Sequence, residues 1–283
     1  INKRTMADDS ALPEIRVHLL PSLFEPAELQ GGVAVIIDVL RASTTIVHAL
    51  ANGAARVIPC ASVEEAHAAA VREPTGSVLL GGERQGIRIP GFDLDNSPRS
   101  YVTEIVANRT IAFTTTNGTA ALRRAAAADE ILIGALVNLS AVARLLRGPS
   151  RPVHLICAGT DQQLTAEDIL CAGLLAGRLT GLLASPEGAS AGAAGELPPG
   201  FIEVGTELAI AFADKHGLTA AAIRAALRAS RGGRNLLELG FDADIDIAAQ
   251  VDSHPLVPVY DPIRRELRRD IRTRGRATPD EHG

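Results

Sequence analysis

The sequence predicts a layered α/β protein whose sheet is largely parallel or mixed. Short apolar runs of strand length alternate along its 283 residues with alanine-rich runs of helical length, and this alternation favours helices on both faces of a sheet. The pattern of Val33–Ile37 and the polar turn after it returns about 75 residues later at Thr110–Thr119, which predicts two duplicated βαβαβ halves. The hydrophobic content of 46% and charged content of 22% are those of a globular chain with a sizeable core.

The expected strands and helices follow from these runs and from the residues that bound them. Ser62 and Asn138 are suitable N-caps, and Gly232 and Gly233 can end the last predicted helix. The predicted strands are Arg16–Leu20, Val33–Ile37, Arg56–Pro59, Val78–Leu80, Thr110–Thr114, Glu130–Ile133, Val153–Cys157 and Ile202–Val204. The predicted helices are Thr44–Asn52, Val63–Val71, Ser97–Val106, Ala120–Ala128, Ser140–Leu146, Glu167–Leu179 and Thr219–Arg231.

These elements predict one catalytic α/β unit over residues 12–262, with half-repeats at about 31–105 and 107–180. The stretch 185–200 is rich in Gly, Ala, Ser and Pro and has no apolar periodicity, so we expect a mobile surface loop. Residues 263–283 carry many charges and few apolar side chains, which is typical of a solvated tail.

Composition argues against several classes of partner. The net charge of −5 provides no global field for nucleic acid or anionic lipid. Cys60, Cys157 and Cys171 are too few and too scattered for a disulfide framework or a zinc site, and they indicate a reducing compartment. No apolar run reaches the roughly 18 residues of a membrane helix, and residues 1–10 lack a signal-peptide core. We therefore expect a cytoplasmic protein without membrane or nucleic-acid partners, and we leave homo-oligomerisation open.

Asp38 and Arg41 are the first candidate site residues. They follow the apolar strand Val33–Ile37 and precede a helix, and the N-terminus of a helix attracts negative charge. An Asp at such a strand end commonly holds Mg²⁺ or acts as a nucleophile, and Arg41 can fork onto a phosphate or sulfonate. The alternatives are that Asp38 only caps the helix and that Arg41 only pairs with Asp38.

Two further segments place charge beside glycine. Gly81–Gly86 presents Glu83 and Arg84 where the backbone can approach a ligand closely, although a plain turn with solvated charges would look the same. In the segment Gly91–Pro98, capping explains Asn96 and Ser97 but leaves Asp93 without a structural role.

The turn Thr114–Thr119 is the densest hydroxyl cluster in the chain. Hydroxyls, the Asn117 amide and Gly118 at a helix start can form a neutral cradle for an anion, or they can serve only as a cap. Cys157 also ends a strand, but a cysteine phosphatase needs Arg six positions later, where this chain has Gln163. A small buried packing residue is the favoured interpretation of Cys157.

Six segments taken together resemble the ComB family, the 2-phosphosulfolactate phosphatases. They are DVLRASTT (38–45), GGERQG (81–86), GFDLDNSP (91–98), TTTNGT (114–119), CAGT (157–160) and ED (167–168), and their order and spacing match the family. The stretch from Asp244 to Val259 is similar to the C-terminal part of that family.

The resemblance implies a phosphoric monoester hydrolase that uses Mg²⁺ to remove phosphate from (2R)-phospho-3-sulfolactate, a step toward coenzyme M. Its implied catalytic residues are Asp38, Arg41, Glu83, Arg84 and Asp168. Its implied metal ligands are Asp38, Glu83, Asp93 and Asp168. Its implied substrate-binding residues are Ser43, Thr44, Asn96, Ser97, Thr115, Thr116, Asn117, Gly118, Thr119, Cys157 and Gly159.

Two other functions stay open at this stage. A phosphatase of the same architecture could act on another small phosphorylated hydroxy acid, because substitutions in a pocket set specificity. Alternatively, the chain could bind anionic metabolites without turnover. A non-catalytic binder would be stabilised by its ligand and would release no phosphate.

Overall fold

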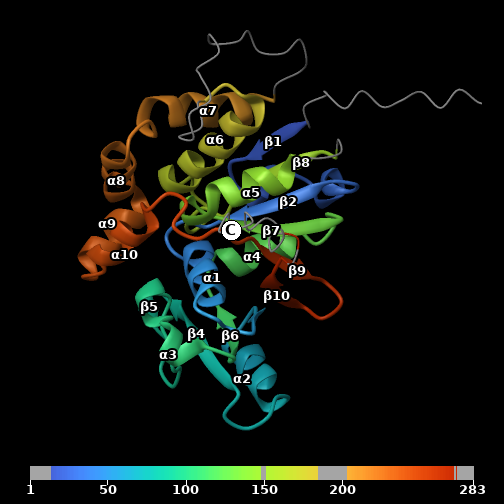
Figure 1. The fold of residues 1–283 in the computed structure, drawn as a ribbon, viewed down its shortest axis with the longest axis vertical. Coiled ribbons are helices and arrows are strands. Elements are labelled where there is room, and N and C mark those ends of the chain that lie inside the picture. Colours follow the sequence, from blue (N-terminus) through green and yellow to red (C-terminus); the bar gives the residue numbers. More distant parts are fainter. Residues whose placement is uncertain (1–13, 148–150, 184–202, 271, 273–283) are drawn as a thin grey trace, which may run out of the picture.

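A computed structural model describes residues 14–147, 151–183, 203–270 and 272 (Figure 1). The predicted loop at 185–200 lies outside these residues. The described chain forms a mixed α/β fold, as predicted. Its strands are β1 (Ile15–His18), β2 (Val33–Ile37), β3 (Arg56–Pro59), β4 (Val78–Arg84), β5 (Ile87–Arg88), β6 (Thr110–Thr114), β7 (Glu130–Gly134), β8 (Val153–Cys157), β9 (Pro258–Asp261) and β10 (Glu266–Arg269).

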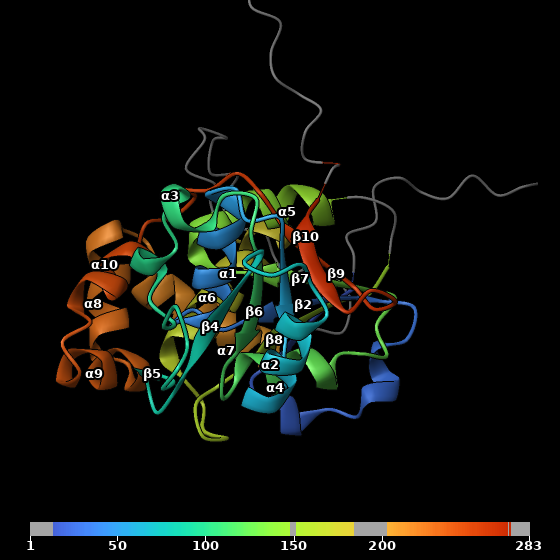
Figure 2. The same ribbon diagram turned by 90° about the horizontal axis from the view of Figure 1, so that it is seen from below.

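The α-helices lie on both faces of the sheet, and α8, α9 and α10 gather on one side of the molecule (Figure 2). They are α1 (Ala42–Ala51), α2 (Val63–Val71), α3 (Thr103–Val106), α4 (Gly118–Arg124), α5 (Leu139–Leu146), α6 (Ala166–Thr180), α7 (Val204–His216), α8 (Ala220–Ala229), α9 (Arg231–Glu238) and α10 (Asp242–Ala248). None of the described helices is long and apolar enough to cross a membrane.

The sheet has the strand order β1-β8-β2-β7-β9-β10-β3-β6-β4-β5. Within the first four strands every pairing is parallel, and so is every pairing among β3, β6 and β4. The hairpin β9–β10 joins the two blocks by antiparallel pairing on both of its sides. Because three antiparallel steps separate β7 from β3, the two parallel blocks run in opposite directions.

The strands of the two predicted half-repeats are exchanged. Strand β2, from the first half, lies between β7 and β8 of the second half. Strand β6, which opens the second half, lies between β3 and β4 of the first. Among the described strands, the only pairing within one half is the short hairpin β4–β5, and no parallel pairing joins two strands of the same half. The duplication itself stays a prediction.

Side chains of β2 alternate between two hydrophobic cores, one on each face of the sheet. Val33, Val35 and Ile37 pack into the core built with α5, α6 and α7. Ala34 and Ile36 pack into the core that contains residues of α1 and α4. All five residues are buried, which is typical of a parallel strand covered on both faces.

Four features differ from the sequence-based expectation. The helix predicted at Thr219–Arg231 ends at Ala229, and Gly232 and Gly233, which were expected to end it, lie inside α9. Val204 begins helix α7, so the strand predicted at Ile202–Val204 is wrong over its described part. The helix predicted at Ser97–Val106 is a short 3-10 turn, Pro98–Ser100, followed by the single turn of α3. Strand β10 lies within the segment predicted as a solvated tail, and its Leu267 is completely buried in the second core.

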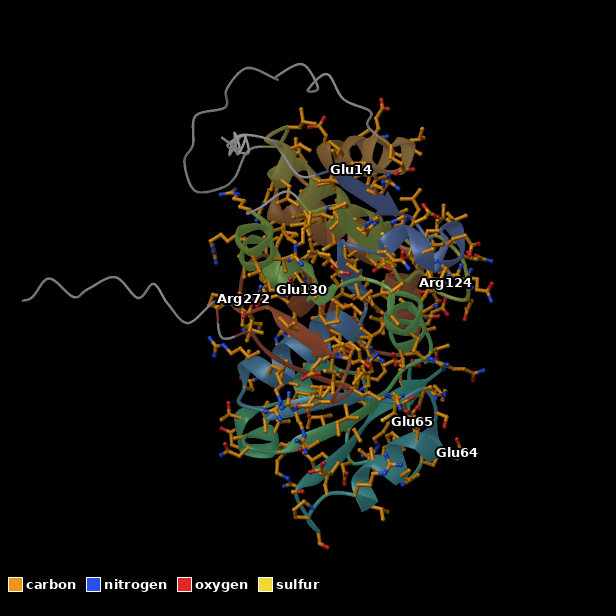
Figure 3. All side chains as sticks on the ribbon, turned by 90° about the vertical axis from the view of Figure 1, so that its right-hand side faces the viewer. Glu14, Glu64, Glu65, Arg124, Glu130 and Arg272 are labelled. Carbon is orange, nitrogen blue, oxygen red and sulfur yellow. The ribbon has the colours of Figure 1, made fainter. Side chains whose placement is uncertain are left out.

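An ion pair also ties this C-terminal segment to the sheet. The guanidinium of Arg272 pairs with Glu130 at the start of β7, and the two side chains lie together in Figure 3. Arg151 pairs with the other carboxylate oxygen of Glu130 at 2.6 Å. The charges of residues 266–272 are therefore partly used in contacts with the folded unit, which composition alone could not indicate.

Candidate active site

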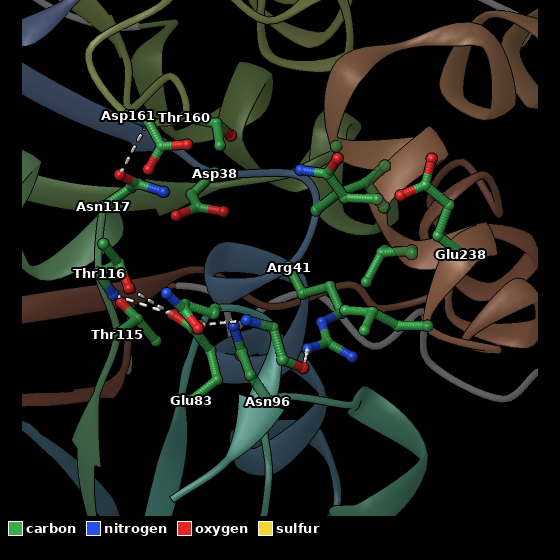
Figure 4. Close-up of a pocket in the computed structure, with 17 residues that line it drawn as sticks. Asp38, Arg41, Glu83, Asn96, Thr115, Thr116, Asn117, Thr160, Asp161 and Glu238 are labelled. Atoms are coloured by element: carbon green, nitrogen blue, oxygen red, sulfur yellow. Dashed lines mark hydrogen bonds between the residues drawn. The ribbon is translucent and has the colours of Figure 1, made fainter.

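A polar cavity of about 420 Å³ lies where the turns after β2, β4, β6 and β8 meet helix α9 (Figure 4). Its lining comprises Asp38, Leu40, Arg41, Glu83, Gln85, Gly86, Asn96, Thr115, Thr116, Asn117, Thr160, Asp161, Gly232, Asn235, Leu236, Glu238 and Leu239. Seven of the seventeen predicted site residues are therefore among the lining residues: Asp38, Arg41, Glu83, Asn96, Thr115, Thr116 and Asn117.

The turns after β2 and β6 meet although these strands are not neighbours in the sheet. A Cβ atom at Gly118, the first residue of α4, would lie 2.9 Å from the Asp38 Oδ2 atom and 2.9 Å from the Ala42 Cβ atom. The start of α4 therefore touches the start of α1. Only a residue without a side chain permits this approach, which brings two helix N-termini to one carboxylate.

Asp38 has one oxygen engaged in a cap. Its Oδ1 atom accepts the Ala42 N–H at 3.1 Å, and its own N–H donates to the Ser43 hydroxyl at 3.0 Å. Within the described residues its Oδ2 atom accepts no hydrogen bond. The capping interpretation is correct for one oxygen, and the second oxygen is left for a ligand.

Burial raises the pKa of three neighbouring acids at and around Asp38. Burial, and then repulsion from Asp168, raises the pKa of Asp38 well above its ordinary value, against the lowering effect of the Ala42 N–H. Burial also raises the pKa of Asp168 to about 6, and burial with repulsion from Asp168 raises that of Glu167 to about 7. The folded chain therefore disfavours the charged forms of these three acids.

Asp168 joins two loops and is not a lining residue of the cavity. Its Oδ1 atom accepts the Val39 N–H at 2.9 Å. Its Oδ2 atom accepts the Gly159 N–H at 3.0 Å and the Thr165 hydroxyl at 2.9 Å. These bonds hold the turn after β2 against the turn after β8. Cys157 is fully buried, and burial raises the pKa of its thiol, which agrees with a packing role.

Glu83 connects the turn after β4 to the turn after β6. Its Oε1 atom accepts the Thr116 N–H at 3.0 Å and the Thr116 hydroxyl at 3.1 Å, and its Oε2 atom accepts the Gly86 N–H at 2.8 Å. Arg84 donates to the Thr114 hydroxyl at 3.1 Å and is not a lining residue. Both residues thus fix the shape of the hydroxyl-rich turn.

Several other predicted residues lie outside the cavity lining. The Ser43 hydroxyl donates to the Ile36 carbonyl at 3.2 Å, and the Thr44 hydroxyl donates to the Val39 carbonyl at 2.7 Å. Thr119 bonds back to Thr115 within its own turn at 3.4 Å. Asp93 is exposed, and its carboxylate accepts the Leu80 N–H at 2.8 Å. These contacts give each of the four residues a structural role.

Arg41 is buried and is held by residues distant in sequence. Its Nη1 atom donates to Asp244 Oδ2 at 2.7 Å, and its Nη2 atom donates to the Gly86 carbonyl at 2.7 Å. Its guanidinium carbon also lies 4.4 Å from the centre of the Phe241 ring. The Ser97 hydroxyl donates to the other oxygen of Asp244 at 2.6 Å. Arg41 therefore pairs with Asp244 and not with Asp38.

Sequence reasoning missed the wall formed by α9 and the residue after it. Five lining residues come from this segment: Gly232, Asn235, Leu236, Glu238 and Leu239. This segment packs tightly against its neighbours at two glycines. A Cβ atom at Gly232 would lie 2.2 Å from the Glu167 Oε1 atom, and a Cβ atom at Gly86 would lie 2.6 Å from the Leu239 side chain. Glu167, which contacts Gly232, could have indicated this wall. In the sequence, however, Glu167 and Asp168 together indicated only the start of a helix.

The charges of the lining are mainly negative. Asp38, Glu83, Asp161 and Glu238 contribute four carboxylates, and Arg41 is the one cation among these lining residues. The described chain contains no group of three or more His, Cys, Asp or Glu side chains arranged to hold a metal ion.

An α/β fold with a polar cavity between two strand-to-helix turns is an arrangement in which small-molecule ligands commonly bind. The model of the 2-phosphosulpholactate phosphatase family matches residues 18–262, and this chain belongs to that family. A protein from Symbiobacterium thermophilum named probable 2-phosphosulfolactate phosphatase is 42% identical over 233 residues, covering 82% of this chain and 93% of that protein. One of the same name from Deinococcus radiodurans is 40% identical over 250 residues, covering 88% and 93%.

Proposed function

We propose that this protein hydrolyses (2R)-phospho-3-sulfolactate to 3-sulfolactate and phosphate, as a step in coenzyme M-type sulfonate biosynthesis. The observation that carries the proposal is the Asp38 carboxylate between the starts of α1 and α4, inside a polar cavity of about 420 Å³. Membership of the family over residues 18–262 and the names of the two relatives support this substrate.

We propose Mg²⁺ as the cofactor because the residues of the cavity fit it. The substrate carries a phosphate, a carboxylate and a sulfonate, yet four carboxylates and one guanidinium line the cavity. A cation from outside the chain would balance these charges and lower the energy of the charged form of Asp38. The free Oδ2 atom of Asp38 is a suitable ligand, whereas both Glu83 oxygens already accept N–H donors.

When bound, Mg²⁺ neutralises phosphoryl oxygens as negative charge develops in the transition state. The chain's own residues bind and orient the substrate. Arg41 pairs with one anionic group, while the Thr115 hydroxyl and the amides of Asn96 and Asn117 donate to the others.

The decisive measurement is phosphate release from 2-phosphosulfolactate with and without Mg²⁺. We expect release that chelation by EDTA abolishes and added Mg²⁺ restores. Asp38→Asn should lower kcat/KM by about 10³-fold or more, because the amide removes the charge that would hold the cation. Its Ala42 contact can persist, so its melting temperature should stay near that of the wild type.

The controls distinguish the alternatives. Asp161→Asn changes an exposed lining carboxylate and should lower kcat/KM by less than about 10-fold. Near-normal turnover by Asp38→Asn would contradict the role of Asp38. Faster turnover of another phosphorylated hydroxy acid in a parallel screen would replace the substrate, and thermal stabilisation without any phosphate release would indicate a binder.

A further inference from the structure

Arg41 is a lining cation of the cavity, and its position depends on contacts from two distant segments. Its side chain is 3% exposed, so solvent does little to orient or neutralise it. Two of its five N–H donors are used by Asp244 and by the Gly86 carbonyl. Within the described residues no hydrogen bond uses the other three donors, and Arg41 is a lining residue of the cavity.

Asp244 provides the only carboxylate that pairs with Arg41 within the described residues. Its side chain is 0% exposed, and its two oxygens accept from Arg41 at 2.7 Å and from Ser97 at 2.6 Å. Asp244 lies in α10, which is separated from Arg41 by 203 residues of sequence. It does not line the cavity, so it can act on a ligand only through Arg41 and Ser97.

We infer that Asp244 is a positioning residue that orients Arg41 toward the anionic substrate and couples helix α10 to the active site. This inference rests on the proposed function for its substrate. A fully buried carboxylate shared by one guanidinium and one hydroxyl restricts the guanidinium plane more than a single contact would. The Phe241 ring beside the guanidinium restricts it further.

Asp244→Asn tests this role because the amide keeps the shape of the side chain and removes its charge. If Arg41 loses its orientation, kcat/KM for 2-phosphosulfolactate should fall by about 10²-fold. Asp246→Asn is the matched control, since Asp246 lies on the same helix and pairs with Arg224 at the surface. Its kcat/KM should stay within about 2-fold of the wild type.

Two further measurements separate positioning from a purely structural contribution. Ser97→Ala removes the second contact of Asp244 without leaving a buried charge unpaired, and it should lower kcat/KM by about 10-fold. Guanidinium ion at millimolar concentration should partly restore turnover to Arg41→Ala. It should restore none to Arg41→Ala combined with Asp244→Asn, because the carboxylate that holds the cation is missing.

The outcomes are distinct. Equal rescue of Arg41→Ala with and without Asp244 would overturn the inference, as would Asp244→Asn with normal kcat/KM. If Asp244→Asn does not fold, Ser97→Ala decides, and its normal activity would overturn the inference. If the wild type releases no phosphate, the proposed function fails independently. In that case the inference is tested by the increase in melting temperature that inorganic phosphate causes. The inference requires this increase to be smaller for Ser97→Ala than for Asp246→Asn.

Discussion

At the scale of single residues, Glu167 is a buried acid beside the start of α9. It is 2% exposed, it accepts from Ser230 and from the Gly232 N–H at the start of α9, and its Oε2 atom has no hydrogen-bond partner among the described residues. Burial first, and repulsion from Asp168 second, raises its pKa from 4.5 to about 7.

This raised pKa predicts a pH dependence of stability. Between pH 4.5 and about 7 the folded chain keeps a proton on Glu167 that the unfolded chain loses, so its contribution makes folding less favourable as pH rises through this window. Glu167→Gln removes the contribution. The free energy of unfolding of Glu167→Gln minus that of the wild type, from urea titrations, should therefore increase with pH across this window.

Glu104→Gln, at an exposed position on α3, provides the control, and its difference from the wild type should vary little with pH. A difference for Glu167→Gln that is flat or decreases with pH would contradict the assignment of Glu167 as a buried acid with a raised pKa.

At the scale of elements, two glycines permit close helix contacts with different consequences. Gly118 lets α4 touch α1 beside Asp38, whereas Gly173 of α6 lets that helix approach the backbone of α7. A Cβ atom at Gly173 would lie 1.9 Å from the Ala209 carbonyl oxygen, and a backbone atom cannot move aside cheaply. One contact shapes the active site, and the other holds the fold.

Alanine at these two positions should separate activity from stability. Gly118→Ala should lower kcat/KM by about 10-fold or more through the displaced Asp38 carboxylate, while helix propensity limits the loss of stability. Gly173→Ala should cost about 1–3 kcal/mol of stability and leave kcat/KM near the wild-type value. Thermal melts and steady-state kinetics on both variants check this, and a reversed pattern would contradict it.

At the scale of the whole molecule, the sheet is completed by residues close to the C-terminal end of the described chain. Leu267 of β10 is completely buried between the two parallel blocks, whereas Ile263, four residues earlier, is 92% exposed. Leu267→Ala should therefore cost about 2–5 kcal/mol of stability, and Ile263→Ala should cost less than about 0.5 kcal/mol. Chemical denaturation of both variants measures the difference, and similar costs would contradict the placement of β10.

The features of the fold that depend on a local pattern of residues could be predicted from the sequence. The runs that form β2, β6 and β8 can be recognised in the sequence because Asp38, Thr115 and Gly159 follow these apolar strands within two residues. The pairing of Arg41 with Asp244 could not be predicted from the sequence, because no local pattern links residues 203 positions apart. The charged stretch around Leu267 looked solvated because one buried apolar residue cannot outweigh its neighbours in composition. The α9 wall was missed because its lining residues are of ordinary surface types.

The exchanged strands have a consequence for how the chain is made. When β2 leaves the ribosome, both of its partners, β7 and β8, are still unsynthesised, and its five apolar residues have no sheet to join. Strand β6 meets β3 and β4 already made, so the block β3-β6-β4 can form first. The N-terminal strand of the active site must therefore wait for a sequence-distant partner, and during that interval the nascent chain carries an exposed strand edge that chaperones can bind.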